Sequence, residues 1–177
     1  MSVLARLLRP RRDSRSASRD ALRPLWHRIV GTSRAPRWYL EGGAADNVPG
    51  RFDMIATLLA LVLLRLERAA APPEQGVLLT ELFVEDMDRQ LRESGIGDLV
   101  VGKQIGKLMS VLGGRLGAYR TALAEGAGPE ALTGAVDRNV TLAEGHDAAP
   151  LAQMLRAWNH QLEAVSSETI LAGEIPL

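Results

Sequence analysis

Apolar residues recur at helical spacing over most of the chain. Residues 51–71, RFDMIATLLALVLLRLERAAA, are apolar around most of a helix circumference, which predicts a helix buried on nearly all sides. The same periodicity predicts helices over residues 79–94, 98–125, 129–144 and 151–167. No segment alternates apolar and polar residues long enough to indicate a strand. The pattern therefore predicts an all-α fold, a compact domain of about five to six helices.

Polar and turn-forming residues set the expected limits of these helices. Residues 72–76, PPEQG, are expected to end the buried helix. Thr80 is placed to cap the next helix, and Asp98 the one after it. Glycines inside a helix cost about 1 kcal/mol each relative to alanine. Close packing of a neighbouring helix is the favoured explanation of Gly102, Gly106, Gly113 and Gly114. The alternative is a kink or a binding groove at these positions.

The start of the chain differs from the rest in charge. Residues 1–51 hold eleven Arg and four acidic residues, a net charge of +7, whereas the other 126 residues carry −7 and the whole chain is neutral. The first 20 residues are predicted to lack fixed structure, with a short helix at about 20–30. We expect a basic, flexible arm over residues 1–35 and a helical domain over 36–177. Such arms typically meet nucleic acid or lipid headgroups.

Composition is that of an ordinary globular protein. Hydrophobic residues make up 46% of the 177 residues and charged residues 24%, enough for one domain with a buried core. Cysteine is absent, so disulfides and thiolate metal sites are impossible. The longest uncharged apolar run, residues 54–64, is far shorter than the roughly 20 residues that span a bilayer. Arg6 and Arg9 interrupt any secretory signal, although the composition also resembles a mitochondrial presequence. A soluble or membrane-peripheral protein is expected.

One short motif suggests nucleotide binding. Residues 97–104, GDLVVGKQ, match the G-x-x-x-x-G-K of a phosphate-binding loop. Gln104, however, stands where Ser or Thr must hold Mg²⁺, and a helix instead of a strand leads into the motif. We therefore expect no nucleotide and no other cofactor.

Other chemistry-bearing residues form no catalytic or metal site in the sequence. The acidic cluster at 84–88, VEDMD, lacks the glycine and glutamate that a calcium-binding loop requires. The three histidines form no H-E-x-x-H, and no serine lies in G-x-S-x-G. Arginine is concentrated in the arm instead of alternating with aromatics, which argues against specific DNA binding. The sequence thus predicts a non-enzymatic protein without a metal or a small-molecule substrate.

Four segments carry a resemblance to a known family: GRFDMI at 50–55, LFVEDMDRQLRESGIGDLVVGKQIGKLM at 82–109, GRLGAYRTAL at 114–123 and LAGEIP at 171–176. Together they resemble the ubiquinol-cytochrome c chaperone family, whose members share G-R-F, D-M-D-x-x-L-R-E-x-G-I/V-G-D-L-x-V-G-K and G-R-x-x-A-Y. The resemblance covers roughly residues 36–177. The chain departs from the family at Leu58, where a histidine is common, and at Leu112 and Gly113, where an aromatic is frequent.

The resemblance implies an all-helical assembly factor for respiratory complex III that binds newly made cytochrome b. Abundant Arg, only two Lys and a short arm suggest a bacterial member. It would then be cytoplasmic and peripheral to the inner membrane, or in the mitochondrial matrix if eukaryotic. The alternative function is that of a peripheral adaptor, whose basic arm binds an anionic membrane surface or ribosomal RNA.

The resemblance also suggests roles for individual residues. We expect a tight turn and a corner between two helices, with Arg92 or Lys103 paired to neighbouring carboxylates. The residues expected mainly to hold the fold are Arg51, Phe52, Asp86, Asp88, Glu93, Gly95, Gly97, Asp98 and Gly102. The residues expected to line an exposed groove or contact the client or partner are Phe83, Met87, Arg92, Lys103, Met109 and Leu112.

Overall fold

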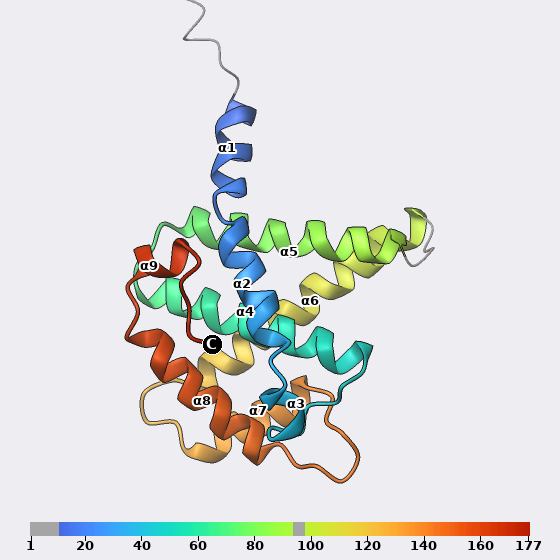
Figure 1. The fold of residues 1–177 in the computed structure, drawn as a ribbon, viewed down its shortest axis with the longest axis vertical. Coiled ribbons are helices and arrows are strands. Elements are labelled where there is room, and N and C mark those ends of the chain that lie inside the picture. Colours follow the sequence, from blue (N-terminus) through green and yellow to red (C-terminus); the bar gives the residue numbers. More distant parts are fainter. Residues whose placement is uncertain (1–10, 94–97) are drawn as a thin grey trace, which may run out of the picture.

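Helices account for the regular structure of the chain (Figure 1). The structure is a computed structural model that describes residues 11–93 and 98–177. The elements are α1 (Arg11–Asp20), α2 (Arg23–Ser33), α3 (Arg37–Leu40), α4 (Val48–Arg68), α5 (Pro73–Glu93), α6 (Asp98–Ala122), α7 (Pro129–Asn139), α8 (Ala149–Glu163) and α9 (Ser167–Leu171). Within the described ranges, extended pairing is limited to one bridge between Ala44 and Leu142. The predicted all-α class is confirmed.

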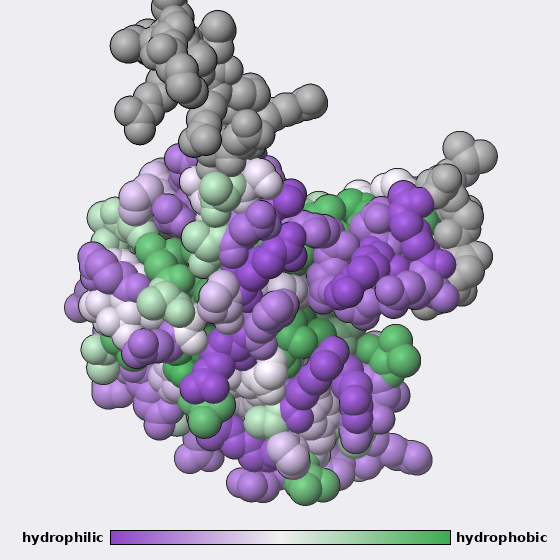
Figure 2. Space-filling view, turned by 45° about the horizontal axis from the view of Figure 1, so that its top comes forward, coloured by the Kyte–Doolittle hydropathy of each residue, from purple (hydrophilic) through white to green (hydrophobic). Residues whose placement is uncertain are grey.

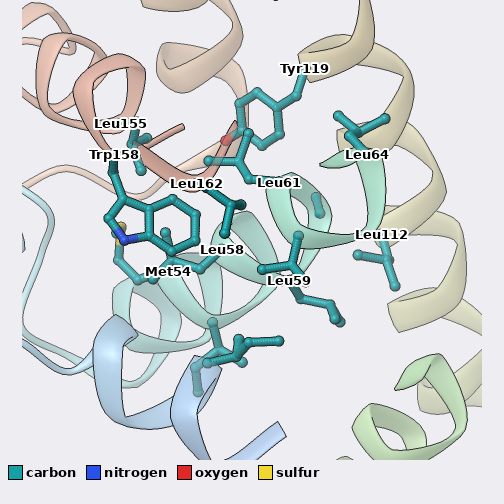
Figure 3. Close-up of a cluster of buried hydrophobic side chains, with 14 of the residues drawn as sticks. Met54, Leu58, Leu59, Leu61, Leu64, Leu112, Tyr119, Leu155, Trp158 and Leu162 are labelled. Atoms are coloured by element: carbon teal, nitrogen blue, oxygen red, sulfur yellow. The ribbon is translucent and has the colours of Figure 1, made fainter. Parts of the chain in front are cut away.

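Helix α4 is the centre of the fold. The helices α2, α5, α6 and α8 pack around it. Figure 3 shows Trp158 and Leu155 of α8 beside Met54 and Leu58 of α4, with Tyr119 approaching from α6. Because apolar residues occupy every side of α4, the helix is stable only when neighbours cover it on all sides. The burial predicted for this segment is confirmed.

The first turn of α4 depends on two neighbouring residues. The side chain of Asn47 accepts a hydrogen bond from the backbone nitrogen of Gly50, at 2.9 Å, and so caps the helix. Gly50 lies against the preceding loop so closely that a Cβ there would be 2.0 Å from the carbonyl oxygen of Ala45. A side chain at residue 50 would therefore force the loop and the helix apart.

Two largely buried polar pairs join α4 to α6. Arg115, which is 3% exposed, donates to Asp53, and the hydroxyls of Thr57 and Tyr119 are 3.0 Å apart. Thr57 follows Asp53 by four residues, and Tyr119 follows Arg115 by four. Four residues make about one helical turn, so the two pairs lie in successive turns of each helix. The other carboxylate oxygen of Asp53 accepts from the backbone nitrogen and the hydroxyl of Thr141, which ties the loop after α7 to the same place.

The start of the chain differs from the predicted arm. Residues 11–20, expected to lack fixed structure, form α1, in which Arg15 and Arg19 pair with Glu81 and Glu85 of α5. The boundary predicted at residue 35 also cuts through the core, which includes Leu22 just before α2 and three side chains of α2: Leu25, Trp26 and Ile29. The many Arg residues in this part of the sequence obscured the apolar side of α2. Residues 1–10 lie outside the described part of the chain.

Several predicted helix limits need further correction; α7, for example, ends at Asn139 instead of residue 144, and α8 at Glu163 instead of residue 167. Helix α5 begins at Pro73, six residues before the predicted start, because proline fits the first turn of a helix. Thr80 consequently lies inside α5, where its hydroxyl donates to the carbonyl oxygen of Gly76 at 2.8 Å and caps nothing. Helix α6 ends at Ala122 instead of residue 125.

The prediction that the glycines of α6 permit close packing of a neighbouring helix is wrong. A Cβ at any of Gly102, Gly106, Gly113 or Gly114 would meet no heavy atom within 4 Å in the part of the chain that the structure describes. These positions face open space. These four glycines of α6 therefore have no packing neighbour within the described chain.

We predict opposite effects of the same substitution at two glycines. Gly50→Ala should lower the free energy of unfolding by about 1–3 kcal/mol, because the added methyl overlaps the carbonyl of Ala45. Gly113→Ala should raise it by up to about 1 kcal/mol, because alanine favours the helix and open space receives the methyl. Urea unfolding of both variants checks this. A destabilised Gly113→Ala protein would restore the close-packing explanation.

Candidate functional site

An apolar groove lies between α4, α5 and α6. It encloses about 1440 Å³. Its apolar lining includes Leu63 and Leu66 of α4, Val77 and Val84 of α5, and Val101, Ile105, Met109 and Leu116 of α6. Val77 is 51% exposed and Met109 is 37% exposed, so part of this lining is open to solvent. Exposed apolar area of this kind, gathered in a concave surface, is typical of an interaction site.

Ion pairs border the groove. Glu67 pairs with Arg120 at 2.8 Å, and Asp88 pairs with Arg92 at 2.6 Å. Arg19 and Glu85 form a third, looser pair at 3.6 Å. Each charge on this border thus has an opposite charge beside it. The site consequently favours an apolar ligand over a charged one.

The exposed glycines of α6 adjoin the groove. Gly102 is part of its lining, and Gly106, Met109 and Gly113 follow at steps of four, three and four residues, which places them on one side of the helix. Because glycine has no side chain, another backbone can approach α6 closely along this side. The groove and the glycine side together form one continuous candidate surface, which we call the α6 face.

The structure divides the predicted contact residues into two groups. Met109 and Arg92 line the groove, and Lys103 is exposed nearby on α6. In contrast, Phe83, Met87 and Leu112 are buried in the core, at 0%, 6% and 2% exposure. They pack within the fold and cannot contact a client in this structure. The sequence placed all six on helices correctly, but helical spacing alone does not tell a core side from a groove side.

The predicted signature residues serve mainly local contacts where the structure describes them. On α5, Arg92 donates to Asp88, and Asp86 accepts from Arg89 and Gln90. Hydrophilic residues predominate over this projecting end of α5 in Figure 2. Glu93 is exposed at the end of the helix. These contacts match the internal pairing expected for Arg92.

Other signature residues lie around the start of α4. Arg51 pairs with Asp46 at 2.6 Å on the surface. Phe52 is half-buried, with its ring centre 6.2 Å from that of Phe83 and 5.6 Å from the guanidinium of Arg115. The predicted turn at Gly95 and Gly97 lies outside the described residues, as does the side chain of Asp98, the first residue of α6.

Sequence reasoning missed the α4 and α5 sides of the groove. Val77 and Val84 are seven residues apart and form a second apolar row on α5, beside the buried row of Leu78, Leu79 and Leu82. This second apolar row was the feature of the sequence that could have indicated the α5 side of the groove. The partnership of Asp53 and Arg115 was also missed, although both lie in segments that carry the family resemblance.

Two kinds of feature are absent from the described residues. Among residues 15–93 and 101–177, whose side chains the structure describes, no three metal-ligating side chains gather at one place. Over the same ranges, none of the helices combines the length and hydropathy required to cross a bilayer.

Comparisons with known proteins agree with this geometry. A family model described as Ubiquinol-cytochrome C chaperone matches residues 41–177. A crystal structure of the Cbp3 homolog from Brucella abortus superposes with a TM-score of 0.71 at 29% sequence identity, covering 98% of this chain and 95% of that one. A comparison with curated proteins found no match.

We predict that Tyr119 resists ionisation while the protein is folded. Burial raises the pKa of Tyr119 above its usual value, with the hydrogen bond to Thr57 opposing this less strongly. Burial likewise raises the pKa of Tyr39. A raised folded pKa means that stability is retained below the unfolded value of about 10 and is lost as pH rises above it. Phenolate absorbance should therefore appear together with unfolding.

Tyr119→Phe provides the matched control for this titration. It should remove the contribution of Tyr119 to the absorbance change and leave that of Tyr39. It should also cost about 1 kcal/mol of stability, because the buried hydroxyl of Thr57 loses its partner. Ordinary titration of both tyrosines near pH 10 in the folded protein would contradict the assignment.

Proposed function

The chain belongs to the ubiquinol-cytochrome C chaperone family, and we propose that it is a non-enzymatic assembly factor for respiratory complex III that holds newly made cytochrome b. In this proposal an apolar segment of cytochrome b lies in the groove between α4, α5 and α6. The observation that carries it is the partly exposed apolar lining, which includes Val77 and Met109. The client would bind at the periphery of the inner membrane.

The physical basis is the cost of leaving an apolar client in water. Burying apolar surface contributes about 25 cal/mol per Å², so a groove that covers one side of an apolar helix keeps it from aggregating. Met109 can adapt to different neighbours because its side chain is unbranched and flexible. The bare side of α6 at Gly106 and Gly113 would let a client backbone come close. Such a surface binds without catalysing anything.

The alternative function, a peripheral adaptor, is supported by α1. Its sequence, RRDSRSASRD, is strongly basic and polar, and Arg15 remains 57% exposed despite its pairing with Glu81. An anionic membrane or ribosomal RNA could compete with α5 for these guanidinium groups. Deleting residues 1–35 would not test this, because it would remove the buried side chains of α2. Deleting residues 1–10 and replacing Arg15 and Arg19 with Gln leaves the core of α2 intact.

We predict that a carboxylate in the groove prevents client binding. Val77→Glu and Met109→Glu should each reduce the amount of cytochrome b that co-purifies from native membranes by about tenfold or more, because placing a charge in an apolar contact costs at least about 1.4 kcal/mol. Immunodetection of cytochrome b after affinity capture provides the measurement. Val48→Glu is the matched control, since Val48 is 83% exposed and lies outside the groove.

The outcomes separate the two functions. Retention of cytochrome b by Val48→Glu and its loss from both groove variants would support the chaperone proposal. If both groove variants retain cytochrome b, the groove is not the client site. If replacing Arg15 and Arg19 of α1 with Gln instead reduces the capture of cytochrome b, and also reduces binding to anionic vesicles, the adaptor function is favoured.

A further inference from the structure

A second, smaller pocket lies on another side of α6. It encloses about 450 Å³ between the start of α4, the middle of α6 and the end of α7. The residues that matter here are Asp53, Lys107, Arg115, Arg138 and Thr141, all of which line it. It shares no lining residue with the groove, so its role is independent of the proposed client site.

Arg115 is incompletely hydrogen-bonded at this pocket. Its Nη2 donates to Asp53 and to the carbonyl oxygen of Asn139. Its Nε and Nη1 are buried, and among the residues that the structure describes no acceptor lies within reach of either nitrogen. The side chain is only 3% exposed. Buried donors of a charged group are costly to leave unpaired, so these nitrogens indicate a missing acceptor.

The charges around the pocket indicate what that acceptor is. Asp53 does not supply that acceptor, because Oδ1 accepts from Nη2 of Arg115 and Oδ2 accepts from Thr141, while Nε and Nη1 have no partner in the described part of the chain. Lys107 and Arg138 are exposed and add two positive charges. With Arg115 at +1 and Asp53 at −1, the four side chains sum to +2. A phosphate group, at about −1.5 to −2 near neutral pH, matches this charge, whereas a carboxylate would leave it half neutralised.

We propose that this pocket binds a phosphate group. The phosphate oxygens would accept hydrogen bonds from Nε and Nη1 of Arg115, while Lys107 and Arg138 contribute positive charge at the rim of the pocket. A volume of about 450 Å³ exceeds that of a single phosphate, which leaves room for the group that the phosphate esterifies. The ligand is therefore either free phosphate or a small phosphate ester.

Calorimetric titration of the full chain tests the proposal. Inorganic phosphate, glycerol phosphate and acetate are titrated separately at constant ionic strength in a phosphate-free buffer. Lys107→Ala and Arg138→Ala remove exposed charges and should leave the fold intact. Each should weaken phosphate binding about two- to fivefold, and the double variant more. Lys103→Ala is the matched control, because Lys103 is exposed one turn earlier on α6 and does not line the pocket.

We expect saturable binding of phosphate that Lys103→Ala leaves unchanged. Tighter binding of glycerol phosphate identifies an ester as the ligand, and equal or weaker binding identifies free phosphate. Three results would overturn the proposal: no saturable heat with either phosphate, equal effects of all three alanine variants, or acetate binding as well as phosphate does. The first of these would mean that water satisfies Arg115.

Discussion

The fold depends on the burial of the central part of α4, from Met54 to Val62. Its apolar side chains face every direction, so the helix requires neighbours on all sides, and α2, α5, α6 and α8 provide them. This explains why α2, which lies within the predicted arm, is part of the folded domain: without Leu25, Trp26 and Ile29, one side of α4 would be exposed to water. The ion pairs between α1 and α5 are additions to this core and, being exposed, contribute little stability.

Apolar contact alone would leave α4 and α6 free to slide along one another. The pairs Asp53–Arg115 and Thr57–Tyr119 select one alignment, because a shift of either helix would leave buried polar groups without partners. That alignment decides which side chains of α6 meet the core and which meet solvent. It buries Leu112 and exposes Met109 and the glycines. The candidate groove is thus a consequence of the same interactions that hold the core.

Helix α6 serves different purposes on its different sides. One side packs against α4, a second forms the α6 face with its exposed glycines, and a third contributes Lys107 and Arg115 to the smaller pocket. Few positions remain that only fill space. This accounts for the exposed glycines of α6, among them Gly102, Gly106 and Gly113, in a helix that would be more stable without them: they reduce intrinsic helix stability and leave the backbone accessible beside an apolar groove. A chaperone of apolar segments benefits from such accessibility.

The sequence by itself determined the helical class and the buried character of residues 51–71, because the hydrophobic period is a local property. It also carried the family resemblance and the pairing of Arg92 with Asp88, which are four residues apart on one helix. Tertiary structure alone decided that Phe83, Met87 and Leu112 are core residues while Val77, Val84 and Ile105 line a groove. It alone brought Asp53 to Arg115 across 62 residues of sequence. The physical reason is that apolar spacing shows that a helix side avoids water, but the neighbour that covers that side, or leaves it open, comes from distant parts of the chain.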